Sequence, residues 1–158
     1  MNEPFSVAIG CDEAGFELKE LLKRHIEDLG YRLKDFGCYS TDPVLYPDIA
    51  TAVATAISAG QHRLGVLICG TGIGMAISAN KIQGIRAAQA HDTYSAERAR
   101  KSNDAQIVSI GARVIGPELA KKNIVKSFLE SEFEAGRSGP KVERIKAVEK
   151  ADREQSPK

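Results

Sequence analysis

The chain has 158 residues, and its 22 Lys and Arg residues nearly balance its 21 Asp and Glu residues, giving a formal net charge of +1. This balance argues against a partner held by bulk charge, such as nucleic acid or an anionic membrane surface. The length and the 42% hydrophobic content predict one globular domain with a substantial core. We expect a cytoplasmic protein, because the N-terminus lacks a signal-peptide pattern and no apolar run approaches the roughly 20 residues that span a bilayer.

Cysteine and histidine usage argues against cross-links and metals. Cys11, Cys38 and Cys69 are odd in number and widely spaced, which predicts no disulfide framework. The three histidines are scattered, and no CxxC-type pair occurs. We therefore expect no metal site.

Apolar runs and helical patterns alternate along the first half of the chain. Short apolar runs that end in turn residues predict strands, and apolar residues at intervals of three or four predict helices. In chain order the predictions are a strand at 5–11, a helix at 16–29, a strand at 31–36, a turn-rich loop at 37–47, a helix at 47–58 and a strand at 64–69.

The alternation continues through the second half. The predictions are a helix at 76–81, a strand at 84–90, a helix at 93–101, a strand at 106–111 and a helix at 117–130. Five alternations of strand and helix predict an α/β fold in which a parallel sheet carries helices on both faces. Ligands of such folds bind at the C-terminal ends of the strands.

The last part of the chain has a different pattern. Residues 134–141 predict a turn-rich basic link, and residues 142–154 predict a highly charged helix. Val142, Ile145 and Val148 form a thin apolar stripe that packs either on its own domain or on another subunit. We therefore divide the chain into a single α/β domain at 1–140 and a charged helix and tail at 141–158, which we expect to pack on a partner subunit.

The third predicted strand runs directly into a glycine-rich segment, Cys69-Gly70-Thr71-Gly72-Ile73-Gly74. A tight turn between a strand and a helix brings unpaired backbone N–H groups together and favours an anion. The same position favours the thiolate form of Cys69, which could act as a nucleophile or as a general base. The alternative is that Cys69 is a small buried residue at a strand end.

Several chemistries of cysteine or glycine loops fit poorly. A tyrosine-phosphatase loop needs an arginine six residues after the cysteine, but that position is Met75. A dinucleotide site needs GxGxxG after the first strand, whereas these glycines follow the third strand at alternate positions. A thiol nucleophile usually needs a histidine partner, for which His91 at the next strand end stays open.

Proton transfer beside a carbonyl fits better. Aldose–ketose isomerisation needs one base that moves a proton between adjacent carbons, together with donors for the enediolate oxygens. Cys69 can be this base, and the Gly70–Gly74 amides with the Thr71 hydroxyl can be the donors. Arg113, Arg137 and Lys141 are available for a phosphate group, although each alone is more often a surface charge.

Nine segments in chain order carry a resemblance to a known family. They are Gly10–Lys19, Asp35–Gly37, Tyr46–Asp48, Ile68–Met75, Ala79–Lys81, Gly84–Ala87, Ser102–Ala105, Gly111–Gly116 and Gly136-Arg137. Over residues 7–145 the chain resembles the ribose-5-phosphate isomerase B family, which includes the galactose-6-phosphate isomerase subunits. The CGTGIG block after a strand is the most specific match.

The resemblance implies a Rossmann-like three-layer αβα sandwich with a five-stranded parallel sheet. It also implies a small sugar-phosphate substrate, no cofactor, and a homodimer or tetramer with active sites at the subunit interface. In this family pattern Cys69 is the base that forms a cis-enediolate, stabilised by Thr71 and the amides around Gly70, Gly72 and Gly74. The remaining assignments are Asp12, Tyr46 and Asn103 at the sugar, Arg113 and Arg137 at the phosphate, and Lys141 where the family usually has a further arginine.

Two departures from the family pattern bear on the substrate. Glu13 and Ser102 stand where the family usually has histidines. The family's histidine at the place of Ser102 is the one thought to open the sugar ring. Serine cannot replace it as a proton shuttle near neutral pH. A tetrose 4-phosphate has no furanose ring to open, because its O4 is esterified. The segment from His91 to Asn103 also resembles a branch associated with tetrulose 4-phosphate.

We therefore favour a tetrose or tetrulose 4-phosphate as the substrate. Ribose 5-phosphate is the alternative, with Asp12, Glu13 or water opening the ring. A non-catalytic sugar-phosphate sensor is a more distant alternative, because Cys69 and Thr71 are both present.

Overall fold

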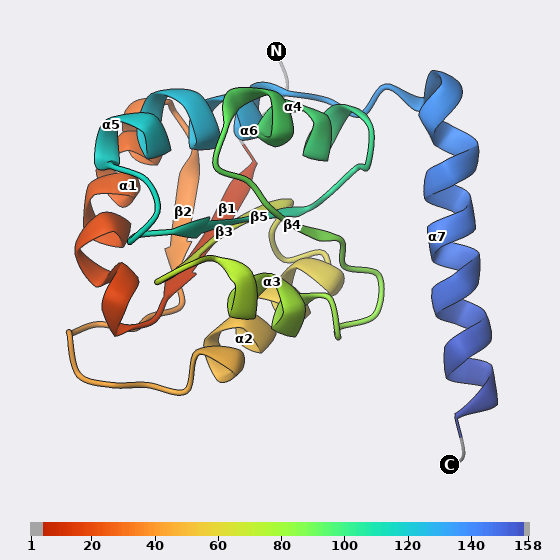
Figure 1. Cartoon of the computed structure of the whole chain (residues 1–158), viewed down its shortest axis with the longest axis horizontal. Coiled ribbons are helices and arrows are strands. Elements are labelled where there is room, and N and C mark those ends of the chain that lie inside the picture. Colours follow the sequence, from red (N-terminus) through yellow and green to blue (C-terminus); the bar gives the residue numbers. More distant parts are fainter. Residues whose placement is uncertain (1–4, 157–158) are drawn as a thin grey trace.

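Five parallel strands lie in the order β2-β1-β3-β5-β4 in a computed structural model that describes residues 5–156 (Figure 1). The strands are β1 (Ser6–Cys11), β2 (Arg32–Asp35), β3 (Leu64–Cys69), β4 (Ala87–Gln89) and β5 (Ile107–Gly111). The central strands β1, β3 and β5 are almost fully buried, as expected for strands covered by helices on both faces. The predicted α/β fold with a five-stranded parallel sheet is confirmed.

Helices cover both faces of this sheet (Figure 1). The helical elements are η1 (Glu13–Gly15), α1 (Phe16–Asp28), α2 (Tyr46–Ser58), α3 (Ile73–Ala79), α4 (Thr93–Lys101), α5 (Pro117–Leu119), η2 (Ala120–Val125), α6 (Lys126–Glu130) and α7 (Ala135–Gln155). The three elements α5, η2 and α6 follow one another without a break over 117–130, so the single helix predicted there is confirmed in extent.

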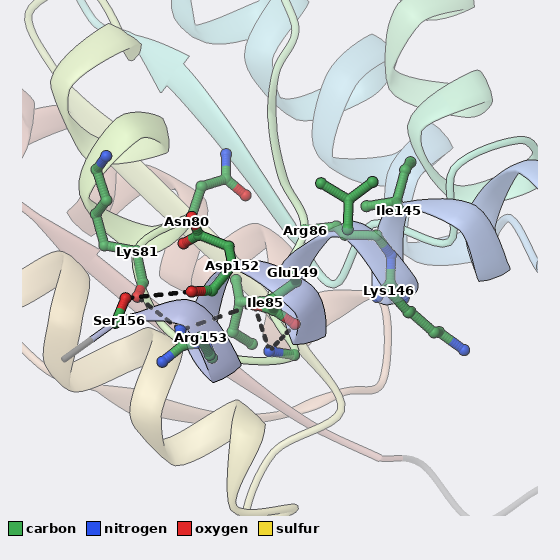
Figure 2. A pocket seen from close by; sticks show the side chains of 12 residues that line it. Asn80, Lys81, Ile85, Arg86, Ile145, Lys146, Glu149, Asp152, Arg153 and Ser156 are labelled. Atoms are coloured by element: carbon green, nitrogen blue, oxygen red, sulfur yellow. Dashed lines mark hydrogen bonds and ion pairs between the residues drawn. The ribbon is translucent and has the colours of Figure 1, made fainter. Parts of the chain in front are cut away.

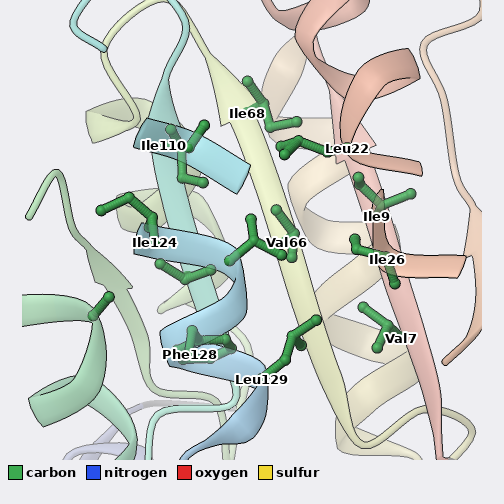
Figure 3. Close-up of a cluster of buried hydrophobic side chains, with 14 of the residues drawn as sticks. Val7, Ile9, Leu22, Ile26, Val66, Ile68, Ile110, Ile124, Phe128 and Leu129 are labelled. Carbon is green, nitrogen blue, oxygen red and sulfur yellow. The ribbon is translucent and has the colours of Figure 1, made fainter. Parts of the chain in front are cut away.

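One core lies on each face of the sheet. On the first face, side chains of β1, β3 and β5 pack against α1, η2 and α6, as Figure 3 shows for Ile9, Ile68, Leu22, Ile124 and Phe128. On the second face α2 and α3 pack against the sheet through a smaller cluster. The cores hold the strand ends rigidly, and the loops at the C-terminal edge are built on these ends.

A fully buried lysine joins α1 to the end of β2. Lys19 Nζ donates to both carboxylate oxygens of Asp35, at 2.8 and 2.6 Å, and Lys23 Nζ lies 2.9 Å from the same carboxylate. Asp35 also accepts the N–H of Gly37 at 2.8 Å. Burial acts to raise the pKa of Asp35, but the hydrogen bonds from Lys19 and Lys23 outweigh it and hold the pKa below its usual value.

The C-terminal helix α7 stands beside the sandwich and not within either layer (Figure 1). It begins at Ala135, so the turn-rich link predicted over 134–141 is wrong. Gly136 absorbs the break with a φ of 21°, and Pro140 lies in the first turn after it, where a missing backbone N–H is tolerated. Val142 is buried, whereas Ile145 and Val148 are about half exposed.

Polar contacts hold the distal half of α7 against its own domain. The Glu149 carboxylate accepts the Gly84 N–H at 3.1 Å, and Arg153 donates to the carbonyl of Lys81 at 3.2 Å. Figure 2 shows these contacts closing one side of a pocket of about 600 Å³ between α7 and the segment that joins α3 to β4. The apolar side chains of Ile145 and Val148 remain about half exposed on α7 and are available for a further contact.

The fourth strand is shorter than predicted, spanning Ala87–Gln89 and not 84–90. Its start is replaced by a turn in which the Asn80 side chain bonds both backbone groups of Ala87, at 2.7 and 2.8 Å. Over residues 5–156, no helix is both long enough and apolar enough to span a bilayer.

Candidate active site

The glycine-rich segment forms a tight loop between β3 and α3, at the C-terminal edge of the sheet. Cys69 closes the strand and is only 5% exposed. Its Sγ accepts the N–H of Gly72 at 3.1 Å. The Thr71 Oγ1 accepts the N–H of Ile73 at 3.2 Å, and its side chain is open to solvent. A thiol and a hydroxyl therefore share one small cluster of backbone N–H groups.

Glycine is required at two positions of this loop for different reasons. Gly72 has a φ of +77°, and a Cβ there would lie 2.9 Å from the carbonyl carbon of Ile110. Gly74 has no such φ, but a Cβ there would lie 2.5 Å from Cζ of Tyr46. The Tyr46 ring thus packs directly on the loop, which brings this predicted sugar contact into the site.

The turn after β5 is hydrogen-bonded to the same loop. Ala112 N–H donates to the Cys69 carbonyl at 2.8 Å, and Arg113 N–H donates to the Gly70 carbonyl at 3.0 Å. The Arg113 side chain lies over Gly70, with Nη1 3.3 Å from where a Cβ would stand. The structure thus places a guanidinium within reach of an anion bound at the loop.

Asp12 extends this group from the end of β1. Its N–H donates to the Ile68 carbonyl at 3.1 Å, and its side chain, 9% exposed, accepts the Gly15 N–H at 3.1 Å. Burial raises the pKa of Asp12, and the neighbouring Glu13 charge adds to the rise, against the lowering by the Gly15 N–H. The glycine-rich loop Cys69–Gly74 is the candidate cradle for a ligand. A buried carboxyl with a raised pKa beside this cradle is suited to holding or moving a proton.

Glu13 itself faces a neighbouring loop. Its Oε2 accepts the N–H of Val44 at 3.2 Å, so it ties the loop before α2 to the end of β1. The Glu13 carboxylate therefore lies between the end of β1 and the loop before α2.

Sequence reasoning missed two polar side chains beneath the loop, Gln89 and Ser109, which donate to its carbonyls at 2.8 and 2.6 Å. The one sequence signal was a serine inside an otherwise apolar strand. His91, left open as a thiol partner, accepts the Gly111 N–H through Nε2 at 2.8 Å. Burial lowers its pKa, which favours the neutral ring that this acceptor role needs.

Four predicted site residues lie elsewhere in the chain. Ser102 and Asn103 follow α4, just before β5 begins, and therefore lie at the opposite edge of the sheet from Cys69. Arg137 and Lys141 lie on α7, close to this second group, because the Glu134 N–H donates to the Lys101 carbonyl at 3.0 Å. Within one chain the structure does not bring these four residues to the glycine loop.

The site residues thus form two groups. The loop group contains Asp12, Glu13, Tyr46, Cys69, Gly70, Thr71, Gly72, Gly74 and Arg113, and the distal group contains Ser102, Asn103, Arg137 and Lys141. The loop group offers a buried thiol, a buried carboxyl and converging N–H donors, which suit proton transfer next to an oxyanion. Among residues 5–156 no three His, Cys, Asp or Glu side chains gather as a metal-binding set.

Comparison with known proteins identifies relatives over most of the chain. A family model described as ribose/galactose isomerase matches residues 7–145. The chain is 53% identical to a D-erythrulose-4-phosphate isomerase of Pectobacterium atrosepticum over 95% of this chain and 99% of that protein. It is 52% identical to a ribose-5-P isomerase B of Listeria innocua over 93% of this chain and 99% of that protein.

Solved structures give the same result. The chain superposes on ribose-5-phosphate isomerase B of Clostridium thermocellum with a TM-score of 0.90 and 40% identity, over 92% of this chain and 98% of that one. The matched region includes both the loop group and the distal group. The chain therefore belongs to the ribose/galactose isomerase family, whose members are sugar-phosphate aldose–ketose isomerases.

Proposed function

We propose that the protein interconverts an aldose phosphate and its ketose through a cis-enediolate, with Cys69 as the base. The observation that carries this proposal is the Cys69 thiol, which is held at a strand end by the Gly72 N–H at 3.1 Å. A thiolate there removes the proton from carbon 2 of the aldose and returns it to carbon 1 of the enediolate. The loop N–H groups and the Thr71 hydroxyl stabilise the negative oxygens that develop during the transfer.

Asp12 and Tyr46 contact the sugar in this proposal. Asp12 is buried and capable of exchanging a proton with a sugar hydroxyl, because burial raises its pKa. Tyr46 packs on Gly74 and limits the depth of the cradle. Glu13 sets the position of the loop before α2 through the Val44 N–H.

We further propose that a second copy of the chain completes the site. The loop group lacks Ser102, Asn103, Arg137 and Lys141, which lie together at the other edge of the same chain. A dimer that places the distal group of one chain on the loop group of its partner supplies two cations for the phosphate. The half-exposed Ile145 and Val148 give α7 apolar surface for this contact.

The preferred substrate in this proposal is a tetrose or tetrulose 4-phosphate. Ser102 stands in the distal group where a ring-opening histidine would be needed for a furanose, and a hydroxyl is a poor proton shuttle near neutral pH. The relatives' names do not separate the two substrates, because proteins named for each are 53% and 52% identical to the chain. Phosphorylated sugars carry charge that keeps them from crossing a bilayer, which fits the cytoplasmic location we propose.

A side-by-side kinetic comparison tests the substrate. We expect kcat/KM for erythrose 4-phosphate to exceed that for ribose 5-phosphate by at least about tenfold, because only the pentose must open a ring before proton transfer. Coupled assays at equal enzyme concentration measure both. A preference for ribose 5-phosphate would favour the pentose alternative and refute the ring-opening argument.

Replacing the thiol tests the reaction class. Cys69→Ala removes the base, and we expect turnover to fall by at least about 10³-fold while circular dichroism stays unchanged. Solvent deuterium entering the sugar phosphate reports the proton transfer directly. Exchange at the wild-type rate in the alanine variant would exclude Cys69 as the base, and absence of exchange in the wild type would favour a sensor.

A further inference from the structure

Two polar side chains on neighbouring strands support the glycine loop from the sheet. Gln89 in β4 and Ser109 in β5 are register partners. The Gln89 side-chain amide donates to the Thr71 carbonyl at 2.8 Å, and the Ser109 hydroxyl donates to the Gly72 carbonyl at 2.6 Å. Ser109 is fully buried. Together they fix two consecutive carbonyls of the loop.

Fixing these carbonyls also aims the N–H groups of the same peptides. In a trans peptide the carbonyl and the following N–H point in opposite directions. With the Thr71 carbonyl held toward Gln89, the Gly72 N–H points to the other side of this peptide and reaches Cys69 Sγ at 3.1 Å. With the Gly72 carbonyl held toward Ser109, the Ile73 N–H reaches Thr71 Oγ1 at 3.2 Å.

We propose that Gln89 and Ser109 are positioning residues that aim the loop N–H groups at the Cys69 thiol and the Thr71 hydroxyl. Each donor below the loop also polarises its peptide, which strengthens the N–H on the other side. The Gln89–Thr71–Gly72–Cys69 chain of hydrogen bonds therefore strengthens the hydrogen bond that Cys69 Sγ accepts. This inference rests on the proposed function only for its effect on turnover.

The hydrogen bonds from Gln89 and Ser109 differ in whether another contact helps to hold the same carbonyl. The Gly72 carbonyl also accepts the N–H of Ala76 at 3.3 Å, so the helix helps Ser109 to hold it. Gln89 is exposed, and its replacement leaves the buried core unchanged. Gln89 is therefore the sharper site for a test.

The test uses Gln89→Leu, which keeps the approximate size of the side chain and removes the donor. Gln89→Glu is a second variant, in which a carboxylate faces the Thr71 carbonyl and repels it. Gln106→Leu is the matched control, since Gln106 also donates to a backbone carbonyl, that of Gly84 at 2.7 Å, but just before β5 at the edge opposite to the loop. Ser109→Ala and Ser58→Ala form a second matched pair, because the Ser58 hydroxyl donates to the Gln83 carbonyl at 2.7 Å, away from the site.

The first readout needs no substrate. We measure the alkylation rate of Cys69 by iodoacetamide against pH, with the modified peptide identified by mass spectrometry. In Gln89→Leu and Gln89→Glu we expect the midpoint of this profile to move upward by about one pH unit, because the thiolate loses an aimed donor. The Gln106→Leu and Ser58→Ala controls keep the wild-type midpoint.

The second readout is turnover. We expect kcat to fall by about tenfold or more in both Gln89 variants, with KM changed by less than about threefold, because the aimed Gly72 N–H supports the proposed base in the chemical step and not the binding of the sugar. An unchanged alkylation midpoint in Gln89→Leu and Gln89→Glu would overturn the positioning role, whatever the activity. A wild-type enzyme without sugar-phosphate turnover would overturn the proposed function and leave the alkylation result to decide the inference.

Discussion

At the scale of single residues, the site depends on two glycines, whose lack of a Cβ leaves room for close contacts with other atoms. Gly72 lets the backbone take a left-handed turn directly over Ile110, and Gly74 lets the Tyr46 ring lie on the loop. The cradle is therefore shaped as much by absent Cβ atoms as by the thiol. The two glycines differ in what they provide, because only Gly72 needs the unusual φ.

Gly74→Ala separates activity from stability. Alanine favours the helix that begins here, by up to about 1 kcal/mol, so we expect little change in the free energy of unfolding. The new Cβ would lie 2.5 Å from Tyr46 Cζ, however, and must displace that ring. We expect kcat/KM to fall by about tenfold or more, because Tyr46, the proposed sugar contact, moves by a fraction of an ångström or more.

Gly116→Ala is the control for this substitution, because a Cβ at Gly116 meets nothing within 4 Å. Steady-state kinetics and chemical denaturation of both variants give the comparison. Full activity in Gly74→Ala would mean that Tyr46 takes no part in the site.

At the scale of elements, the Lys19–Asp35 ion pair holds α1 on β2. Lys19 is fully buried, and its Nζ lies 2.6 Å from the Asp35 carboxylate. Asp35 also accepts the Gly37 N–H, which anchors the start of the loop that leads to Tyr46. One carboxylate therefore links the packing of an edge strand to the start of the loop before α2.

Asp35→Asn should destabilise the fold by about 3 kcal/mol, because it leaves a buried lysine without its main counter-ion. The folded-state pKa of Asp35 is lowered, so its stabilising effect is present above its unfolded pKa of about 3.9 and is lost as the pH falls through the lower folded value. We therefore expect the difference between wild type and variant to be full at pH 6 and to shrink below about pH 4.

Urea denaturation at several pH values measures this difference. Glu143→Gln, which removes an exposed ion pair with Lys146 on α7, should change the free energy of unfolding by less than about 0.5 kcal/mol. A difference for Asp35→Asn that stays constant from pH 6 to pH 3 would contradict the assignment.

At the scale of the whole molecule, the loop group lies at the C-terminal ends of the strands, and the distal group lies toward the opposite ends of the same strands. The loop group lies at or just after the ends of β1, β3 and β5, joined by Tyr46 from the start of α2, whereas the distal group precedes β5 or lies on α7. Two copies related by a twofold axis can therefore each lend the other a distal group. Such an arrangement makes turnover a property of the assembly.

Complementation tests this arrangement. Cys69→Ala and Arg137→Ala chains should each be nearly inactive at low substrate concentration. When the two are unfolded together and refolded as a mixture, shared sites restore about a quarter of wild-type activity, because half of the dimers are mixed and each of these has one intact site. Activity that stays at the level of the separate variants would show that one chain supplies both residues.

Much of this fold could be predicted from the sequence, and the structure brings one part of the predicted site together at the Cys69 loop. Alternating patterns located all five strands, and the rule that parallel strands end at one edge accounts for the nearness of Asp12 and Arg113 to the Cys69 loop, although the sequence assigned Arg113 to the phosphate together with Arg137 and Lys141. The same rule, applied to residues that precede a strand, also places Ser102 and Asn103 at the opposite edge, although sequence reasoning did not use it.

The remaining features depend on contacts that no local pattern carries. Residues 134–141 contain two glycines and a proline, and only the kink at Gly136 lets them join α7. Gln89 and Ser109 are ordinary strand residues until the sheet register sets them beneath the loop. Such roles depend on pairing between distant segments and cannot be obtained from spacing along one chain.

The two outer strands limit how the protein can aggregate. The β2 edge exposes Arg32 and Lys34, and the β4 edge is only three residues long. Charged or very short edges are poor templates for another chain's backbone. Growth of the sheet from copy to copy is therefore disfavoured at both edge strands, which leaves the helices as the surfaces through which copies can meet.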